Sequence, residues 1–358
     1  MLMAFILLLK VMIEILSIND QIRWDDIVKS FKKYDVYYLN EYTKAFFIHG
    51  DGWPVLFYYE DQNGKAINVA MKRDISECEY FSDIEKNKYF DLTTPYGYGG
   101  WLIEDDPDLD LLFKEYDKWC IDNNIISEII RFHPILNNAY DVKDYYEILD
   151  LGKTIAMDLS SEDVIWGNFT TQNRGKIKKA LNNNVVIEHC LNENIIKEFK
   201  TIYEVTMNKD HADDYYYFND EFYLSIMNDL KDHADIFYAL YEDKIIAATI
   251  ILRCNQRLTY HFSGVLTDYR NIQATNLMLY EIAKWGCANG YKTFHLGGGV
   301  GSKEDNLFIF KKSFNKKDSY QYSIGKKIYN KQIYDYLLGL RSGEFNHSFF
   351  PEYRGGNL

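Results

Sequence analysis

A run of glycines followed by a lysine is the stretch whose residue types are best suited to chemistry. Gly297, Gly298 and Gly299 follow a predicted strand, and glycines let backbone N–H groups approach a ligand closely. Lys311 comes next, on a short helix that the spacing of Phe310 and its apolar neighbours predicts. Taken alone, the glycines are equally compatible with a tight turn, and the lysine with a solvated helix face.

The elements around this pair predict one α/β unit in the second half of the chain. Three β-rich runs come first, and a long helix and a strand then lead into the glycines. A short helix carrying Lys311 and a last strand complete the unit. The strands are predicted at residues 236–241, 245–252, 258–263, 293–296 and 320–324, and the long helix at residues 274–289.

The first half of the chain repeats this order in a shorter form. Strand-like runs at Val55–Glu60 and Ala66–Lys72 flank Asp61-Gln62-Asn63-Gly64, which is a strong hairpin signal. A loop rich in glycine and tyrosine, Thr94–Gly100, precedes an amphipathic helix and a further strand.

Two α/β domains with mixed, largely antiparallel sheets therefore account for the whole chain. The chain turns polar near Asp158–Asp163 without a linker rich in Pro or Ser, so we place the domains at residues 1–160 and 161–358. Close packing of the two domains would leave a cleft between or beside them.

Several motifs resemble those of one enzyme family. His295–Gly299 and Leu307–Phe314 reproduce, without gaps, the H-L-G-G-G and L-F-x-F-K-x-x-F motifs of the Fem-type (FemAB) peptidoglycan-bridge aminoacyltransferases, which belong to the GNAT acyltransferase superfamily. Tyr260–Gly264 is similar to the family's Y-H-x-S-G strand end, and Thr94–Gly100 and Arg131–Pro134 also resemble family signatures. The long helical arm of some members has no heptad-rich counterpart here, which indicates the compact, armless type.

The resemblance implies two tandem GNAT-like domains and roles for individual residues. Attack of an amine on an ester or thioester builds negative charge on the carbonyl oxygen, and each cation or N–H group aimed at that oxygen lowers the barrier by about 3 kcal/mol. By similarity, Lys311 is this cation and Phe310 shapes the substrate pocket. The backbone of Gly297–Gly299 is implied as a helper.

The acceptor-binding residues are likewise implied by the resemblance, for a muropeptide and its diphosphate. Lys209 stands where the family has an arginine, so it offers a point charge without bidentate geometry. No dedicated base for the amine is evident, and His211, His261 and His295 are the candidates. The implied substrate-binding residues are Tyr96, Tyr98, Lys209, Tyr215, Tyr217, Tyr260, His261, Ser263, Gly297, Gly298 and Gly299.

The identity of the acyl donor depends on the segment before the long helix of the second half. Acetyl-CoA-dependent GNAT proteins cradle pyrophosphate on R/Q-x-x-G-x-G/A, and this chain has Arg270-Asn271-Ile272-Gln273-Ala274-Thr275 there. Gln273 and Thr275 replace the small residues, so their side chains block close approach of the backbone to phosphates. This argues against a conventional acyl-CoA site and favours aminoacyl-tRNA as co-substrate.

Two basic segments offer a surface for the phosphates of a tRNA acceptor stem or of a nucleotide-linked precursor. Residues 302–331 hold eight lysines and three acidic residues, and Thr171–Ala180 holds four basic residues and no acidic one. Both segments are also typical of solvated faces. The net charge of −13 argues against a general nucleic-acid binder and leaves local patches open.

We therefore expect an acyltransferase that forms an amide bond, moving an amino acid from aminoacyl-tRNA to an amine of a nucleotide- or lipid-linked peptidoglycan precursor. One alternative keeps the fold and uses acyl-CoA or a carrier-linked acyl donor on an amino sugar of a surface polysaccharide. Another is a non-catalytic binding protein on a GNAT scaffold. No cofactor or metal is expected, because His and carboxylates are not spaced as metal ligands. The oligomeric state stays open.

The cysteines and the N-terminus bear on the compartment. Five dispersed cysteines form no C-x-x-C pair, which favours a reducing cytoplasm. The apolar run at the N-terminus is broken by Lys10 and Glu14 and is shorter than the ~20 residues of a membrane span. We expect a cytoplasmic protein, with a peripheral position at the inner membrane face as an alternative. Residues 1–11 are compatible with an upstream extension before a start at Met12.

Overall fold

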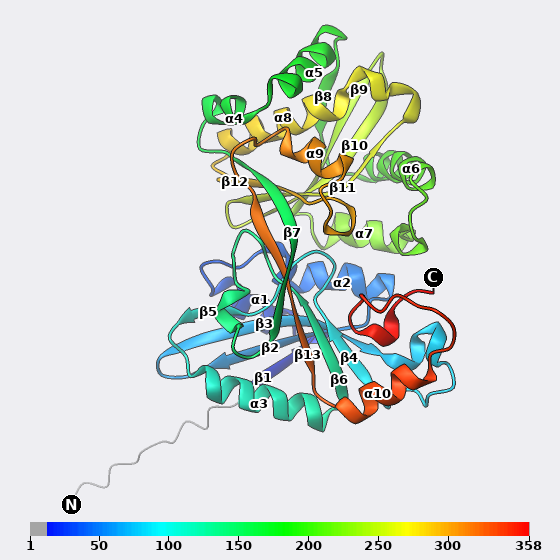
Figure 1. The fold of residues 1–358 in the computed structure, drawn as a ribbon. Coiled ribbons are helices and arrows are strands. Elements are labelled where there is room, and N and C mark those ends of the chain that lie inside the picture. The colour runs from blue at the N-terminus through cyan, green and yellow to red at the C-terminus, as the bar shows by residue number, and fades with distance from the viewer. Residues whose placement is uncertain (1–12, 358) are drawn as a thin grey trace, which may run out of the picture.

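One continuous mixed sheet with flanking helices runs through residues 13–357, the part of the chain that the computed structural model describes (Figure 1). The strands are β1 (Glu14–Ser17), β2 (Trp53–Glu60), β3 (Gly64–Asp74), β4 (Phe90–Thr93), β5 (Leu102–Asp105), β6 (Ile125–Arg131), β7 (Glu147–Asp158), β8 (Val186–His189), β9 (Ala234–Tyr241), β10 (Lys244–Cys254), β11 (Arg257–Val265), β12 (Thr293–Gly297) and β13 (Tyr320–Ile328). The helices are α1 (Gln21–Lys29), α2 (Asn40–His49), α3 (Leu109–Asp122), α4 (Glu162–Asn168), α5 (Thr171–Asn182), α6 (Glu193–Lys209), α7 (Asp220–Asn228), α8 (Ala274–Ala288), α9 (Asn306–Lys312) and α10 (Lys331–Leu340).

The strand order of this sheet is β1-β2-β3-β4-β6-β13-β7-β12-β11-β10-β9-β8, and β5 pairs with β3 beside the path. Among these pairs only β4 with β6 and β11 with β12 are parallel. In each half, antiparallel strands thus lead into one parallel pair. The next strand toward the middle of the sheet is β13 on the side of the first half and β7 on the side of the second. The predicted α/β class with mixed, largely antiparallel sheets is confirmed.

Local sequence accounts for the first hairpin. The Oδ1 atom of Asp61 accepts hydrogen bonds from the backbone N–H groups of Asn63 at 2.7 Å and Gly64 at 2.9 Å, which closes the turn. β2 and β3 pair without a register shift, from Trp53 opposite Lys72 to Glu60 opposite Lys65. The predicted hairpin is present, and both of its strands are longer than predicted.

β7 joins the two halves because it is long enough to pair in both (Figure 1). Its residues 147–154 pair with β13, and its residues 155–158 pair with β12. β13 lies between β6 and β7, antiparallel to both. The prediction that this strand completes the second domain is therefore wrong, because the chain returns to the first half after α9.

The predicted division at residue 160 needs a further correction at the C-terminus. Tyr334 and Leu337 of α10 and Tyr353 beyond it are buried against Ile75 and Ile126 of the first half. Residues after about 320 therefore belong with the first half, although they are last in sequence. A period-2 pattern identifies a strand and its buried face, but it does not identify the neighbour with which the strand pairs.

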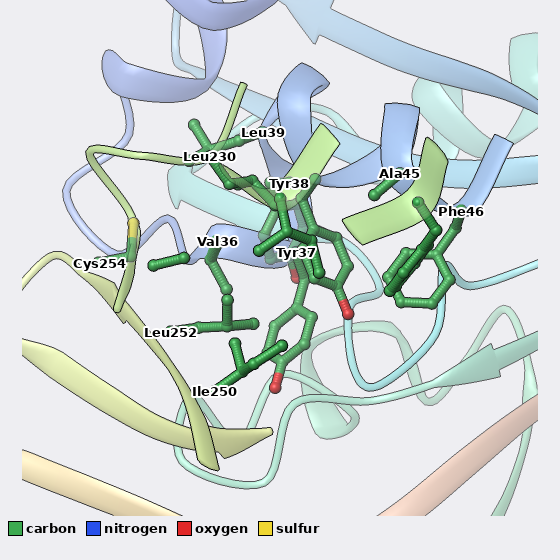
Figure 2. Close-up of a cluster of buried hydrophobic side chains, with 14 of the residues drawn as sticks. Val36, Tyr37, Tyr38, Leu39, Ala45, Phe46, Leu230, Ile250, Leu252 and Cys254 are labelled. Carbon is green, nitrogen blue, oxygen red and sulfur yellow. The ribbon is translucent and has the colours of Figure 1, made fainter. Parts of the chain in front are cut away.

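A buried core crosses from one half to the other (Figure 2). Val36 and Tyr37 of the first half lie in one cluster with Ile250 and Leu252 of β10, and none of the four side chains is more than 2% exposed. Because apolar surface of both halves is removed from water together, the halves are fixed relative to each other. Residues from opposite ends of the sequence can therefore build one site.

No helix within residues 13–357 has the length and apolar character needed to cross a membrane. The expectations about residues 1–11 lie outside the described part of the chain.

Candidate active site

The start of α9 is tied to the glycine loop by one aspartate. Asp305 caps the helix, with Oδ1 accepting the backbone N–H of Phe308 at 2.9 Å. Its Oδ2 accepts the backbone N–H of Val300, just after the glycines, at 3.1 Å. The helix therefore has a fixed position relative to Gly297–Gly299, and this position directs Lys311 in its last turn back toward them.

Lys311 is buried, with 8% of the residue exposed. Its Nζ donates a hydrogen bond to the carbonyl oxygen of Gly298 at 2.6 Å. Burial lowers the pKa of Lys311 to about 8, although the nearby carboxylate of Asp305 acts in the opposite direction. The side chain is therefore mostly protonated at pH 7. Two of its three N–H groups remain for a ligand.

Gly297 lies beside this ammonium group, with no side chain of its own between them. It has a φ of +77°, a conformation that favours glycine. A Cβ atom at this position would lie 3.3 Å from the Nζ of Lys311 and 3.7 Å from the hydroxyl of Tyr98. At Gly298 a Cβ would lie 2.8 Å from the carbonyl oxygen of Lys153, so the loop also packs closely on β7.

Tyr98 comes from the first half of the chain and reaches the glycine loop of the second. Its ring packs on His295 of β12, with ring centres 5.2 Å apart, and on Tyr322 of β13, at 5.7 Å. Burial raises the pKa of the Tyr98 hydroxyl well above its usual value, so the hydroxyl keeps its proton. The Tyr98 and Lys311 that the family resemblance singled out therefore lie together.

Two of the predicted base candidates are buried imidazoles. Burial lowers the pKa of His295 and of His261 to about 3, so both rings are neutral at pH 7 and accept protons poorly. Neither ring nitrogen of His295 has a hydrogen-bond partner within residues 13–357. The third candidate, His211, is exposed after α6.

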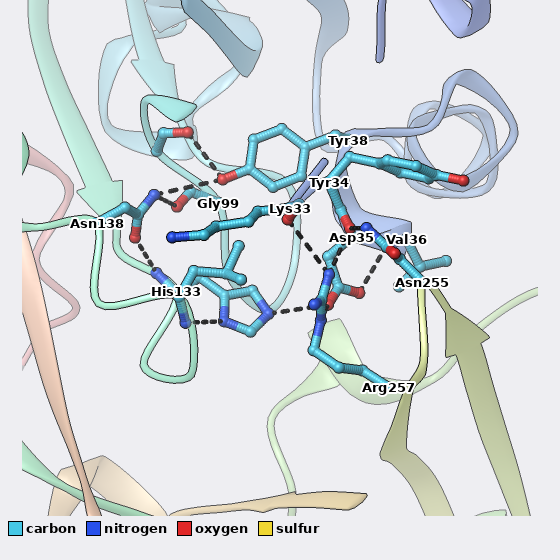
Figure 3. Close-up of polar contacts among 12 residues, drawn as sticks. Lys33, Tyr34, Asp35, Val36, Tyr38, Gly99, His133, Asn138, Asn255 and Arg257 are labelled. Carbon is cyan, nitrogen blue, oxygen red and sulfur yellow. Dashed lines mark hydrogen bonds and ion pairs between the residues drawn. The ribbon is translucent and has the colours of Figure 1, made fainter. Parts of the chain in front are cut away.

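A polar network that includes His133, one of the rings packed on Tyr98, links the halves (Figure 3). Asp35 lies 3.3 Å from the Nε2 of His133 and 2.5 Å from the Nε of Arg257, which belongs to β11. Burial raises the pKa of Asp35, but His133 and Arg257 outweigh it and lower the pKa to about 2. His133 also packs on the ring of Tyr98, with ring centres 5.7 Å apart.

A β-bulge turns His261 toward the first half. Tyr260 and Phe262 pair with adjacent residues of β10, so His261 is the extra residue in β11. Its ring lies 5.6 Å from Tyr96 and 4.0 Å from Phe262. The bulge explains why two consecutive side chains, His261 and Phe262, face the same aromatic cluster.

Tyr96 and Tyr215 extend this cluster away from Lys311. Their ring centres are 6.0 Å apart, and Tyr96 also stacks on Phe46 of α2 at 5.3 Å. The Tyr215 hydroxyl donates to the Oδ2 of Asp51 at 2.7 Å. Burial raises the pKa of Asp51 despite this hydrogen bond.

The remaining predicted residues lie apart from the lysine or pack elsewhere. Lys209 is exposed at the end of α6, 3.3 Å from Asp210, and the Tyr217 hydroxyl donates to Asn208 at 2.7 Å. Phe310 packs edge-on against Phe314 at 5.4 Å. Tyr260 lies against the core of the second half, and Ser263 lies opposite Thr249 of β10.

Two residues of the site were not identified as such from the sequence. Asp51 follows α2 in no recognisable motif. Arg131 stood inside a signature but was given no role, and its guanidinium donates to the carbonyl oxygens of Thr94, Pro95 and Gly97. This arginine holds the loop that carries Tyr96 and Tyr98.

Comparisons with known proteins bear on this arrangement. Residues 171–305 match a family model described as "Acetyltransferase (GNAT) domain". The chain contains a GNAT acyltransferase domain. The resemblance of its motifs to the Fem-type branch is in agreement, and this GNAT domain includes β9–β12 with the glycine loop and ends at Asp305, the cap of α9. No curated protein sequence is similar enough to count as a relative.

Solved structures extend the similarity beyond the GNAT domain to most of the chain. The crystal structure of FemX is similar at a TM-score of 0.65 and 14% identity, over 90% of this chain and 99% of that one. The structure of L-PGS from Bacillus licheniformis is similar at 0.57 and 14% identity, over 90% and 96%. A C-terminal domain of a putative lysylphosphatidylglycerol synthetase from Agrobacterium fabrum is similar at 0.57 and 12%, over 86% and 91%. At these identities the likeness concerns the fold.

Within residues 13–357, no group of three or more His, Cys, Asp and Glu side chains is placed to hold a metal ion. The groups gathered at the glycine loop are a buried cation, a protonated phenol and backbone groups.

Proposed function

We propose that this acyltransferase moves an amino acid from aminoacyl-tRNA to an amine of a peptidoglycan precursor, forming an amide bond. The observation that carries the proposal is the buried ammonium group of Lys311, held by Gly298 and lying beside Gly297. An amine that attacks an ester leaves negative charge on the carbonyl oxygen. A protonated lysine in a site shielded from water stabilises that charge more than an exposed lysine does.

The start of α8 supports a donor other than acyl-CoA. Gln273 is the N-cap residue, in a left-handed conformation with a φ of +66°. Its side-chain Nε2 donates to the carbonyl oxygen of Arg270 at 3.1 Å, so the side chain lies beside the turn that leads into the helix. Thr275, in the first turn, is partly exposed. A pyrophosphate would meet these side chains before it reached the backbone N–H groups.

The part of the lysine-rich segment around the end of α9 adjoins the start of α5 in space, which supports a donor with phosphates along its length. The backbone N–H of Thr170, before α5, donates to the carbonyl oxygen of Ser313, after α9, at 2.9 Å. The backbone N–H of Lys316 donates in turn to the carbonyl oxygen of Asn168 at 3.0 Å. The exposed or half-exposed basic side chains of this surface are Arg174, Lys176, Lys178, Lys179, Lys312, Lys316 and Lys317.

The folds of FemX and of L-PGS also support transfer of an amino acid, to a cell-wall precursor or to a lipid. Among these acceptors we favour the peptidoglycan precursor, because the motifs around Lys311 resemble those of the Fem-type family. Such a reaction would place the protein in the cytoplasm, where charged tRNA and nucleotide-linked precursors meet.

The test offers the purified full chain labelled aminoacyl-tRNA and labelled acetyl-CoA in parallel. A nucleotide-linked muropeptide, a lipid-linked muropeptide and phosphatidylglycerol serve as acceptors, and mass spectrometry identifies the product. We expect an aminoacyl-muropeptide from charged tRNA, and no such product from the Lys311→Met variant. If phosphatidylglycerol were the only acceptor to receive the amino acid, this lipid would replace the peptidoglycan precursor as the proposed acceptor.

One observation favours a second candidate, an N-acyltransferase that uses acyl-CoA or a carrier-linked acyl group on an amino sugar. The matching family model is described as an acetyltransferase domain. Efficient acetyl transfer to glucosamine-type acceptors in the same assay, with none from charged tRNA, would establish this candidate instead.

A further inference from the structure

We propose that the Tyr98 hydroxyl is a second donor to the acyl oxygen, acting beside Lys311 during transfer. The inference rests on the proposed function and adds a catalytic residue to it. Family resemblance assigned Tyr98 to acceptor binding, whereas the structure brings its hydroxyl and the Nζ of Lys311 to the same glycine, Gly297.

The space at Gly297 is bounded by these two side chains. A Cβ atom built on Gly297 would have two non-neighbouring atoms of residues 13–357 within 4 Å: the Nζ of Lys311 at 3.3 Å and the hydroxyl oxygen of Tyr98 at 3.7 Å. Both are hydrogen-bond donors, and both distances are within about 1 Å of hydrogen-bond length. An oxygen atom of a ligand beside Gly297 would therefore have both an ammonium and a phenol hydroxyl nearby.

The Tyr98 hydroxyl is available for such an oxygen. It makes no hydrogen bond to any residue in the described range 13–357, whereas the Lys311 ammonium uses one N–H on Gly298. The ring is held in place by His295, His133 and Tyr322. A phenol fixed by its ring, with a free hydroxyl and a raised pKa, is preorganised as a neutral donor.

The reaction step uses both donors without consuming either. The amine nitrogen forms a bond to the carbonyl carbon of the ester, and the electron pair of the C=O bond moves to oxygen. That oxygen accepts hydrogen bonds from Lys311 and Tyr98, which keep their protons. When the C=O bond re-forms, the ester oxygen leaves with its electron pair and takes up the proton that the amine loses, directly or through water.

The two halves of the chain then share the catalytic centre. Tyr98 is contributed by the loop after β4, and Lys311 by α9, which begins one residue after the GNAT match ends at Asp305. The second half alone would supply only one of the two donors, which gives the first half a role in the chemical step.

The experiment compares the full-length chain with Tyr98→Phe, which keeps the ring packing on His295 and removes only the hydroxyl. We expect kcat to fall about 100-fold with KM changed less than about threefold, as for loss of one oxyanion donor. Tyr322→Phe is the matched control, because its hydroxyl is not among the atoms near Gly297, and it should keep kcat within about twofold. Since both donors serve one oxygen, Tyr98→Phe should cost much less in a Lys311→Met background.

A second reaction separates this inference from the proposed substrates. Cleavage of p-nitrophenyl acetate also builds an oxyanion and needs no particular acceptor. Ester cleavage that depends on Tyr98 and Lys311, with no transfer from any biological donor, would support the inference and contradict the proposed substrates. A Tyr98→Phe variant with unchanged kcat in transfer would overturn the inference, as would a change confined to KM. A wild-type chain inactive in both reactions would contradict both proposals.

Discussion

At the scale of single residues, burial of the charged Lys311 has a cost in folding free energy that the fold alone does not require. Its pKa is lowered from 10.5 to about 8 by burial, which corresponds to about 3 kcal/mol of unfavourable free energy for the charged form. One hydrogen bond to Gly298 offsets part of this cost. Lys311 has no carboxylate within 4 Å among residues 13–357, and a buried charge of this kind is a feature expected of a functional site.

The Lys311→Met variant should therefore be more stable than the wild type at pH 7, by about 1–2 kcal/mol after the loss of the hydrogen bond. Because the folded pKa is lowered, the penalty is fully present below pH 8 and fades as pH rises toward 10.5. Urea denaturation at pH 7 and at pH 10 should give a smaller gain at the higher pH. Lys312→Met, one residue along, should change stability little. A Lys311→Met variant less stable at pH 7 would show that the ammonium is a net structural contact.

The sequence was most informative for residues within one contiguous motif. Lys311 and the glycines were identified because strand, loop and helix follow each other directly in the chain. Tyr98 was identified by resemblance but was assigned to binding of the acceptor, since nothing in the local sequence indicates that its hydroxyl lies near Gly297. Asp51 was missed because its neighbours in the site, such as Tyr215, come from distant segments.

At the scale of elements, the glycine loop and α9 act as a unit that aims the lysine. Gly297 and Gly301 both have positive φ, at +77° and +59°. Only a Cβ at Gly297 would approach Lys311, whereas a Cβ at Gly301 would meet nothing within 4 Å. The two glycines therefore share the backbone strain and differ in their contact with the site.

Gly297→Ala and Gly301→Ala should each lower stability by about 1 kcal/mol, because alanine is strained at positive φ. Gly297→Ala alone should also lower kcat, by at least about tenfold, since its methyl group occupies the space beside Lys311 and Tyr98. Thermal unfolding and steady-state transfer on both variants provide the measurement. Equal activity in the two variants would mean that no reacting atom enters this space.

Element types followed from the sequence, while pairing partners did not. The hairpin at Asp61 and the strand before the glycines carry their own local signals. The place of β13 between β6 and β7 depends on a long return of the chain, and no local pattern encodes it. The bulge at His261 was equally invisible, because it results from the register between β10 and β11.

At the scale of the whole molecule, the site depends on two halves held in one arrangement. β7 is shared by both, the core in Figure 2 spans both, and Asp35 meets Arg257 across the junction in Figure 3. Asp35 is 2% exposed, so removing its cationic partner leaves a buried carboxylate short of compensation.

Arg257→Ala should destabilise the chain by about 3–5 kcal/mol, as expected for one partner removed from a buried ion pair. Arg253→Ala is the matched control, since that arginine of β10 donates only to carbonyl oxygens, at 3.1 and 3.5 Å, and should cost about 1 kcal/mol. Asp35→Asn in the Arg257→Ala background should restore part of the loss. Equilibrium denaturation measures all three, and equal costs for the two arginines would remove the role of the ion pair.

The central claim is that the protonated Lys311 donates to the acyl oxygen. The pH dependence of the transfer rate tests this claim most directly. Single-turnover transfer rates of the wild type and of Lys311→Arg are measured from pH 6 to pH 10, and their ratio cancels ionisation of the acceptor amine. Because the lysine must hold its proton to donate, the ratio should be constant below about pH 7 and should fall as pH rises through 8. A ratio that rises through pH 8 would indicate that Lys311 acts as a base. A ratio that does not change with pH would indicate that Lys311 takes no part in the reaction.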